Sequence, residues 1–476
     1  MLIFLRILTL LLISSAFSTP AFSAISVAPP DESGGMSKVD GTVFCKGLDD
    51  GAIGTIDGVV YKVFYSAKTA VAAEVVADGT EENPRACVSN VTSLESAFQR
   101  LVNFDKNLSD WDTSNVTNIR LLFNQTVNFT GNLKGWDMSH VESLDTMFAV
   151  SKNFQGNLSE WDISNAICLC FTFMDTTDFK GDISKWNTSS ITTLTGVFSS
   201  AINFQGDIGG WDTSNVTKIS YLFNSSVNFK HDLSGWDTSN VTSFSSAFIS
   251  SENFQGNLSG WDLSNVAELY AVFSGSKNFQ GNLSGWDTSN VTRLENGFYG
   301  TENFRGNLSG WDTSKVTNIN GIAKFSKDFQ ADLSSWDTSN VIYARDLFIS
   351  SQNFQGNIGG WDMSKAENLW GAFENVTGFR DDISNWNVRN VTDMTEMFKG
   401  ANFDQDLTAW CVSKIPSRGP YMFAYNSVGW SESLHPVWGT CPKTPEEQAE
   451  ELAQEAFKAA EAARATNYTY KRAILN

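Results

Sequence analysis

A column of aspartates is the part of this sequence whose residue types and spacing could do chemistry. An Asp follows Trp at the same place in successive 25-residue repeats, as at Asp212, Asp237, Asp262, Asp287 and Asp312. Stacked about 4.8 Å apart, neighbouring carboxylates would repel by ~1 kcal/mol in water and more at lower dielectric. Some interaction must offset this repulsion.

Two interpretations of the aspartate column remain open. One is Ca²⁺ bound between adjacent layers, because hard cations prefer oxygen ligands. The other is a turn cap, in which each carboxylate accepts backbone N–H bonds from the Ser-Asn-Val segment that follows. Asn187 and Asn387 replace Asp in two repeats and keep the acceptor without the charge, which favours the cap.

Catalytic motifs are missing from the sequence. The three histidines, His140, His231 and His435, lie in different contexts, and no nucleophile motif, phosphate-binding glycine loop or zinc-spaced Cys/His cluster occurs. The serines and aspartates belong to columns repeated many times, whereas a catalytic group is normally singular in its surroundings. We therefore predict a protein that is not an enzyme and has no cofactor, with Ca²⁺ as the alternative.

A second column carries side chains suited to binding. It lies after the valine of each repeat and varies strongly in residue type. Tyr, Trp and Arg are favoured binding anchors when exposed, and the alternative is neutral drift on a tolerant surface. The candidate residues for a ligand-binding face are Arg120, Tyr270, Glu295, Arg345 and Trp370.

The element that positions both columns is a repeated layer. Trp recurs every 25 residues from Trp111 to Trp386, and a final copy, Trp410, comes one residue early. Such a period is typical of a solenoid, in which each turn adds one layer to a continuous core. Two Phe columns, a Leu/Ile column and a mainly Val column accompany the Trp, so the core should be dry and ordered. Thirteen layers would make a rod or arc on the order of 60 Å long.

Each layer is predicted to contain one short parallel β-strand and one short helix or 3₁₀ turn. The strand is expected at Leu-x-x-Trp-x-Thr, as at 233–238. The helix is expected in the following segment, where apolar residues recur at i, i+3 and i+7 after a Thr-Ser-Asn cap. Gly156, Gly206 and Gly256 mark a sharp return of the chain. The predicted fold class is thus a leucine-rich-repeat-like solenoid, capped at both ends.

The predicted segments are a signal peptide at 1–23, an N-terminal cap at 24–86, thirteen repeats at 87–410, a C-terminal cap at 411–443 and an acidic helical tail at 444–476. The N-terminal cap should contain a hairpin that turns at Asp57-Gly58. The tail is either a solvated appendage or a docking helix for a partner or for self-assembly.

The six cysteines suggest two disulfides from their location alone. Cys45 and Cys87 bracket the segment before the repeats, and Cys411 and Cys441 bracket the segment after them. Six cysteines allow fifteen pairings, of which we predict Cys45–Cys87 and Cys411–Cys441. Cys168 and Cys170 lie inside one repeat and are predicted to be core or surface thiols rather than metal ligands.

The ends and the charge indicate an exported protein. A basic start, the apolar run 7–13 and a small-x-small site at 21–23 predict a signal peptide, with an N-terminal anchor as the alternative. No later stretch approaches the roughly 20 apolar residues of a membrane span. The net charge of −20 disfavours nucleic acid and anionic membranes as partners.

The repeat resembles that of the BspA-like leucine-rich-repeat surface proteins. The resemblance covers residues 40–442 and rests on Phe-x-Gly-Asn-Leu-Ser-Gly-Trp-Asp-Thr-Ser-Asn-Val-Thr and on the closing Trp-Cys…Trp-Gly-Thr-Cys-Pro. It implies a secreted or cell-surface protein, often an adhesion or interaction module, without enzymatic activity in the repeats. Many relatives are lipoproteins, but no cysteine lies near the predicted cleavage site here.

Two functions are compatible with these features. The first is recognition or adhesion through an extended face of the coil, with an extracellular protein or glycan as the partner. The second is a structural, self-assembling wall or sheath component, which could depend on Ca²⁺. Near-identical layers with few distinctive side chains favour the second, and the variable column favours the first.

Overall fold

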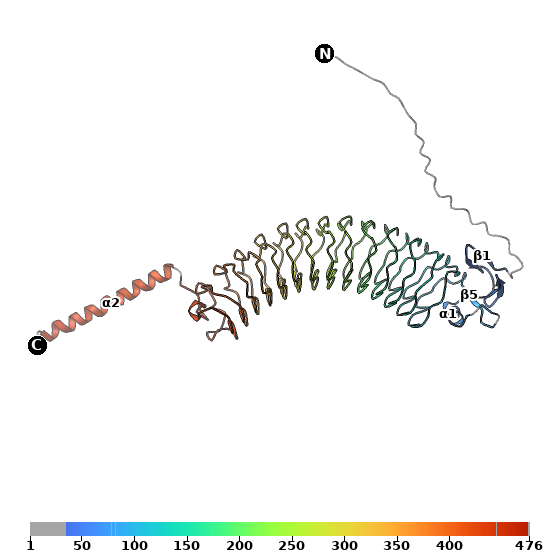
Figure 1. Cartoon of the computed structure of the whole chain (residues 1–476). Coiled ribbons are helices and arrows are strands. Elements are labelled where there is room, and N and C mark those ends of the chain that lie inside the picture. The colour runs from blue at the N-terminus through green and yellow to red at the C-terminus, as the bar shows by residue number, and fades with distance from the viewer. Residues whose placement is uncertain (1–34, 78, 81, 444, 475–476) are drawn as a thin grey trace, which may run out of the picture.

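The computed structural model describes residues 35–77, 79–80, 82–443 and 445–474. These residues form an arched coil, with a cap at its N-terminal end and a long helix leaving its C-terminal end (Figure 1). The predicted signal peptide, 1–23, lies outside the described residues. The regular elements are β1 (Ser37–Val39), β2 (Thr42–Phe44), β3 (Ile53–Ile56), β4 (Val59–Val63), α1 (Ala67–Val76), β5 (Arg85–Cys87), the 3₁₀ helix η1 (Glu432–Leu434) and α2 (Pro445–Ile474).

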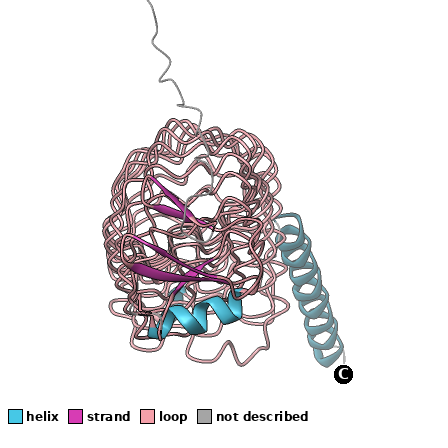
Figure 2. Cartoon of the chain, turned by 90° about the vertical axis from the view of Figure 1, so that its right-hand side faces the viewer, coloured by secondary structure: helices cyan, strands magenta, loops and turns pink. Residues whose placement is uncertain are grey.

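The N-terminal cap is built from two hairpins and a helix that lie across the end of the coil (Figure 2). β3 and β4 pair in antiparallel fashion, and Asp57 and Gly58 turn the chain with φ of 52° and 80°. This confirms the predicted hairpin, because both central residues of a type I′ turn need positive φ. β5 pairs in parallel with β4, and the Cys45–Cys87 disulfide closes the cap as predicted. The β1–β2 hairpin and α1 were not predicted.

The tryptophans stack through the coil as the period predicts. Most successive indole rings lie 5.8–6.5 Å apart at their centroids and are nearly parallel, as in Trp161–Trp186 and Trp286–Trp311. Between Trp261 and Trp286 the Phe244 ring packs against both indoles, at 5.4 and 5.6 Å. All of the indole rings are buried. Most also donate their indole N–H to the Leu/Ile column of the preceding layer, as Trp236 does to the Ile208 carbonyl at 2.9 Å. Each layer therefore contributes both apolar area and a polar tie to its neighbour, and the chain is a repeat solenoid.

A run of tight turns occupies the segment that was predicted to be helical. Within 219–226, every second backbone N–H group donates to a carbonyl of the next layer. These donors are the N–H groups of Ile219, Tyr221, Phe223 and Ser225. The N–H groups between them donate to the carbonyl three residues earlier in their own layer, from Leu222, Asn224 and Ser226. Tyr221 and Ser225 have φ of 60° and 59°, and paired positive-φ residues recur at these two positions in most layers.

The predicted α-helix and the predicted strand are both wrong, whereas the alternative of a 3₁₀-type turn is confirmed in part, because the hydrogen bonds within a layer join residues three positions apart. An α-helix uses its N–H groups on its own carbonyls and leaves none for the neighbouring layer. Within 88–410 no residue is helical, and the parallel bridges join the turn runs, for example Lys218 to Ser243. The predicted strand at 233–238 is itself a turn, because the Trp236 N–H donates to the Leu233 carbonyl.

We call the outer surface of the stacked turns the ladder face. It presents, in most layers, the bridge residue and the residue two positions later, such as Tyr343 and Arg345. Hydrogen-bonded layers repeat every ~4.8 Å, whereas the Phe column nearest the turns repeats at 5.1–5.9 Å and the Trp column at 5.8–6.5 Å. The layers therefore fan outward from the ladder face, which lies on the concave side of the arch in Figure 1.

The predicted return glycines are close-contact positions. A Cβ at Gly256 would lie 2.3 Å from the His231 carbonyl oxygen and 2.6 Å from the Phe254 ring. The backbone of one layer thus passes directly against the preceding layer, with room only for hydrogen.

The C-terminal cap ends the aromatic stack with perpendicular rings. Trp430 packs edge-on against Phe403 at 4.6 Å, and Trp438 packs edge-on against Phe423 at 4.8 Å. Cys411–Cys441 closes this cap as predicted. α2 then leaves the coil and runs to Ile474, within the helical tail predicted at 444–476 (Figure 1). No described helix combines the length and apolar character needed to cross a membrane.

Candidate recognition surface

The aspartate column caps turns. The Asp212 carboxylate accepts the backbone N–H of Ser214 at 3.0 Å, and the same contact to the residue two positions on recurs at 2.8–3.0 Å for Asp237, Asp262, Asp287 and Asp312. The serine hydroxyl and its backbone N–H lower the pKa of Asp212, Asp237, Asp287 and Asp312. Asn187 makes the equivalent contact to Ser189 at 3.2 Å.

This geometry accounts for the column without a cation. The hydrogen bonds offset the repulsion between neighbouring carboxylates, and Asn supplies the same acceptor. Across the described residues, no group of three or more His, Cys, Asp or Glu side chains could hold a metal ion.

The five predicted ligand-face residues do not form one site. Arg120 lies near the N-terminal end and pairs with Glu95 and Asp145 across three layers, at 3.5 and 2.9 Å. Tyr270 is exposed on its own layer. Glu295 is buried, with 7% of its surface exposed, so its assignment to the ligand face is wrong. The Glu295 carboxylate forms an ion pair with the Arg293 guanidinium, with 2.7 Å between Glu295 Oε1 and Arg293 Nη2.

Arg345 and Trp370 are brought together. Their layers are adjacent, and the guanidinium carbon of Arg345 lies 5.8 Å from the centroid of the Trp370 ring. Such a cation–π contact presents a flat aromatic ring and a charge side by side. The bridge between Tyr343 and Asn368 places the exposed Tyr343 ring on the same face.

Further ring and charge contacts connect Arg345 and Trp370 to neighbouring aromatic residues. We call this group the aromatic patch; its members are Tyr299, Phe325, Tyr343, Arg345 and Trp370. The Phe325 ring meets the Tyr299 ring edge-on at 5.3 Å, and Lys324 Nζ lies 5.4 Å over it. Lys324 and Arg345 both reach the Asp346 carboxylate, at 3.7 and 3.9 Å. Burial raises the pKa of Asp346, and the two cations oppose that effect.

Phe325 is held in an unfavourable backbone conformation. Its φ is 59°, and the equivalent positions of other layers carry Gly275, Gly300 and Ser350. A bulky residue rarely adopts positive φ, which disfavours L-residues by roughly 1–2 kcal/mol. The ring is nevertheless 44% exposed, so burial does not offset this strain.

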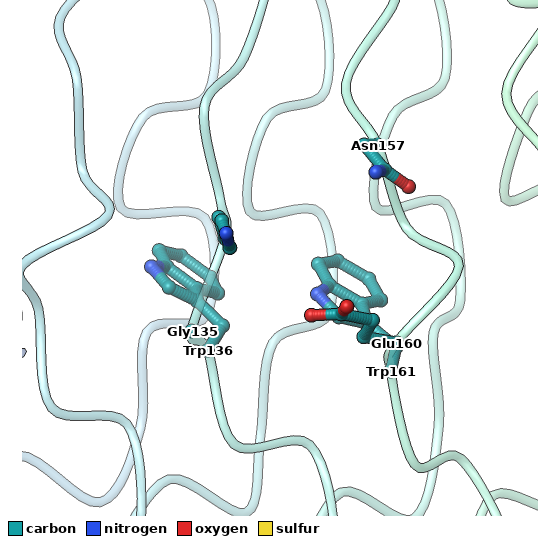
Figure 3. Close-up of a pocket in the computed structure, with 6 residues that line it drawn as sticks. Gly135, Trp136, Asn157, Glu160 and Trp161 are labelled. Atoms are coloured by element: carbon teal, nitrogen blue, oxygen red, sulfur yellow. The ribbon is translucent and has the colours of Figure 1, made fainter. Parts of the chain in front are cut away.

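A polar recess lies between two layers outside the ladder face (Figure 3). It measures 210 Å³ and is lined by Lys134, Gly135, Trp136, Asn157, Glu160 and Trp161. The two parallel indoles form its floor, and the buried Trp161 N–H has no hydrogen-bond partner there. One ammonium group, that of Lys134, and one carboxylate, that of Glu160, line the recess beside the two indoles.

Most of the coil matches one known family. Residues 69–180, 168–286, 268–375 and 351–433 match DUF285, described as Mycoplasma protein of unknown function. The chain belongs to the DUF285 family. Each of the four matched segments spans several 25-residue layers. The first segment begins within α1 and the last ends within η1, so together they extend from the N-terminal cap to the C-terminal cap. No curated protein and no solved structure matches the chain.

Three members of the aromatic patch in this DUF285 coil were not predicted from the sequence. Tyr299, Phe325 and Tyr343 lie at other positions of the layer than the variable column, and a helical interpretation would turn those positions to different sides. A usable signal was present. Aromatic residues stand there at positions that are mostly small or polar in other layers.

Proposed function

We propose that this DUF285 protein is an exported recognition protein whose ladder face binds an extracellular protein, with the aromatic patch as its anchor. The observation that carries the proposal is the Arg345–Trp370 contact within a cluster of aromatic rings, of which Phe325 and Tyr343 are exposed and Trp370 and Tyr299 are half-buried. Tyr, Trp and Arg are the residues most enriched among side chains that dominate protein-binding energy. The concave surface of a solenoid suits an extended partner.

The residue type at position 325 supports the same proposal. Positive φ at this position belongs to the turn pattern of every layer, but most layers place a small or polar residue there, whereas this layer carries an exposed Phe. An exposed ring with positive φ contributes little to the core, so its value lies in what it contacts outside the chain.

The proposed location is extracellular. Three disulfides within the described residues favour an oxidising compartment. The net charge of −20 disfavours nucleic acid and anionic membranes as partners. We also propose that the DUF285 coil is a relative of the BspA-like leucine-rich repeats, because the Leu-Ser-Gly-Trp-Asp-Thr-Ser-Asn-Val-Thr segment is common to both. The protein would act without enzymatic activity.

The test compares two triple variants for binding of labelled protein to cells and extracellular matrix. The patch variant replaces Tyr343, Arg345 and Trp370 with Ala. The control replaces Arg120, Tyr221 and Tyr270, which are exposed residues outside the aromatic patch, with Ala. We expect the patch variant to bind at least about tenfold more weakly, equivalent to ~1.4 kcal/mol, and the control to bind normally.

Pretreating the surface identifies the class of partner. Protease treatment of the cells should abolish binding, whereas periodate oxidation of their glycans should leave it unchanged. Equal binding by the patch variant, or loss of binding after periodate alone, would contradict the proposal.

A second candidate function, self-association, is favoured by α2. This helix stands clear of the coil with Leu452 and Phe457 exposed by 66% and 64% (Figure 1). Most acidic residues of α2 lie in its N-terminal half and all four of its basic residues follow Phe457, so two copies would match charges in antiparallel orientation. Light scattering should then give a dimer that Leu452→Glu with Phe457→Glu converts to a monomer. A wild-type monomer at high concentration would exclude this function.

A further inference from the structure

The third disulfide joins Cys168 to Cys170 within a single turn of the ladder face. These cysteines are two positions apart, whereas the other pairs are separated by 42 and 30 residues. The structure corrects the prediction that Cys168 and Cys170 are thiols, because side chains two positions apart on the ladder face point to the same side and can meet. A disulfide constrains the unfolded chain less as its loop shortens. Stapling the fold is therefore a poor explanation for this pair.

The coil does not need this disulfide for its hydrogen bonds. The N–H groups of Leu144 and Thr146 donate to the carbonyls of Cys168 and Cys170, at 3.0 and 2.8 Å. The next layer carries Thr193 and Thr195 at the same two positions, and its carbonyls receive the equivalent bonds at 3.2 and 2.9 Å. Layers with a disulfide and layers without one thus stack in the same way.

The two sulfurs are not equivalent. The Cys170 backbone N–H lies 3.0 Å from Cys168 Sγ and donates toward it. In other layers the backbone N–H at this position donates to a side-chain oxygen instead, as the Arg120 N–H donates to Asn118 Oδ1 at 3.1 Å. A donor aimed at sulfur stabilises its thiolate. Cys168 is therefore the better leaving group, and Cys170 is the sulfur that an incoming thiolate should attack.

The Asp145 carboxylate in the preceding layer is paired with a cation. Both cysteines are partly exposed. Asp145 occupies the position of Cys170 in the preceding layer, and Arg120 pairs with its carboxylate at 2.9 Å. Thr195 occupies that position in the following layer.

We propose that Cys168–Cys170 is a thiol–disulfide exchange site through which the ladder face forms a covalent bond to a thiol. The incoming thiolate attacks Cys170 Sγ and forms a new S–S bond as the Cys168–Cys170 bond breaks. Cys168 leaves with the electron pair as a thiolate, held by the Cys170 N–H, and then takes a proton from water. The exchange needs no separate oxidant or reductant, because one disulfide replaces another. The thiol can belong to a small molecule or to a cysteine of a bound protein.

The test uses the full chain and two thiol probes, glutathione and a single-cysteine peptide. After exposure to graded probe concentrations, free thiols are alkylated in acid and the sites are read by peptide mass spectrometry. We expect the probe on Cys170 and the alkyl group on Cys168, at concentrations at least tenfold below those that open Cys45–Cys87 or Cys411–Cys441. A preference for glutathione would indicate a small-molecule thiol as the natural partner, and a preference for the peptide would indicate a protein cysteine.

A matched variant, Cys168→Thr with Cys170→Thr, copies the Thr193-x-Thr195 layer. It should keep the unfolding midpoint of the wild type and take up no probe. A large fall in its midpoint would overturn the proposal by making the disulfide structural. So would a probe that opens Cys411–Cys441 first, or that attaches to Cys168 instead of Cys170.

Discussion

Arg85 and Asp110 join the N-terminal cap to the first layer of the coil, with Arg85 Nη1 2.8 Å from Asp110 Oδ2. Arg85 also reaches the buried Glu74 at 2.7 Å, and the Tyr61 hydroxyl donates to Asp110 at 3.0 Å. Burial raises the pKa of Tyr61, and the neighbouring Asp110 carboxylate raises it further. One guanidinium thus neutralises two carboxylates that belong to different parts of the fold.

Arg85→Met should loosen the cap. It leaves Glu74 and Asp110 buried without a cation, and breaking a buried pair typically destabilises by ~3–5 kcal/mol. Thermal unfolding, with hydrogen exchange of β3–β5, measures the change. The control is Lys38→Met, whose partner Asp57 is mostly exposed and which should change stability by less than about 1 kcal/mol. Equal effects of the two variants would contradict the role given to Arg85.

Gly256→Ala should destabilise the coil although only one methyl group is added. The new Cβ would meet the His231 carbonyl oxygen and the Phe254 ring, and overpacking of this kind typically costs ~1–3 kcal/mol. Gly210→Ala is the matched control, because a Cβ at Gly210 would have no neighbouring atom within 4 Å. Urea unfolding of the two variants should separate them, and similar midpoints would refute the close-contact explanation.

Acid should weaken the coil through the aspartate caps. The folded-state pKa of Asp212, Asp237 and Asp287 is lowered by the serine hydroxyl and N–H groups. Their contribution to stability is therefore present above the unfolded value of about 3.9 and is lost as pH falls through the folded pKa. Replacing all three with Asn should flatten the dependence of the urea midpoint on pH below about 4.

The same variant tests the Ca²⁺ alternative. If the column only caps turns, a chelator at pH 7 should leave the unfolding midpoint of the wild type unchanged. A rise in the midpoint with Ca²⁺ that disappears in the triple Asn variant would instead support a cation between the layers.

Phe325→Gly should separate stability from recognition. Glycine relieves the strain at φ of 59°, worth roughly 1–2 kcal/mol, while the lost contact with Tyr299 offsets part of that gain. We expect an unchanged or raised unfolding midpoint together with weaker binding to cells. Tyr221→Gly, also at positive φ and exposed but outside the aromatic patch, should raise stability and leave binding intact. A marked fall in the stability of Phe325→Gly would show that the ring serves the fold.

The sequence was sufficient for the architecture because Trp and Phe identify the core directly. The 25-residue interval of Trp111 to Trp386 requires stacked layers whatever the backbone does between them. The Asp57-Gly58 hairpin and the two cap disulfides followed from turn chemistry and location. Asn187, in place of Asp, pointed correctly to the cap.

The local backbone could not be predicted in the same way. Apolar residues at i, i+3 and i+7 satisfy both a helix and a run of three-residue turns, and only the neighbouring layer decides between them by claiming alternate N–H groups. Tyr221 and Ser225 carry no sequence mark of positive φ, since neither is Gly or Asn. Because of this ambiguity, Phe325 and Tyr343 were not assigned to the predicted binding face. It also led to the wrong expectation that Glu295 is exposed, whereas its carboxylate is paired with Arg293.

Because the alternating N–H pattern recurs from layer to layer, adjacent layers are joined by equivalent backbone hydrogen bonds along the coil. Deleting or duplicating one 25-residue unit would bring together two surfaces that already fit, with both caps untouched. Genes for such chains can therefore lengthen or shorten by unequal recombination without passing through an unfoldable intermediate. The reach between the N-terminal cap and α2 becomes a quantity that evolution can adjust in steps, independently of what any single turn of the coil binds.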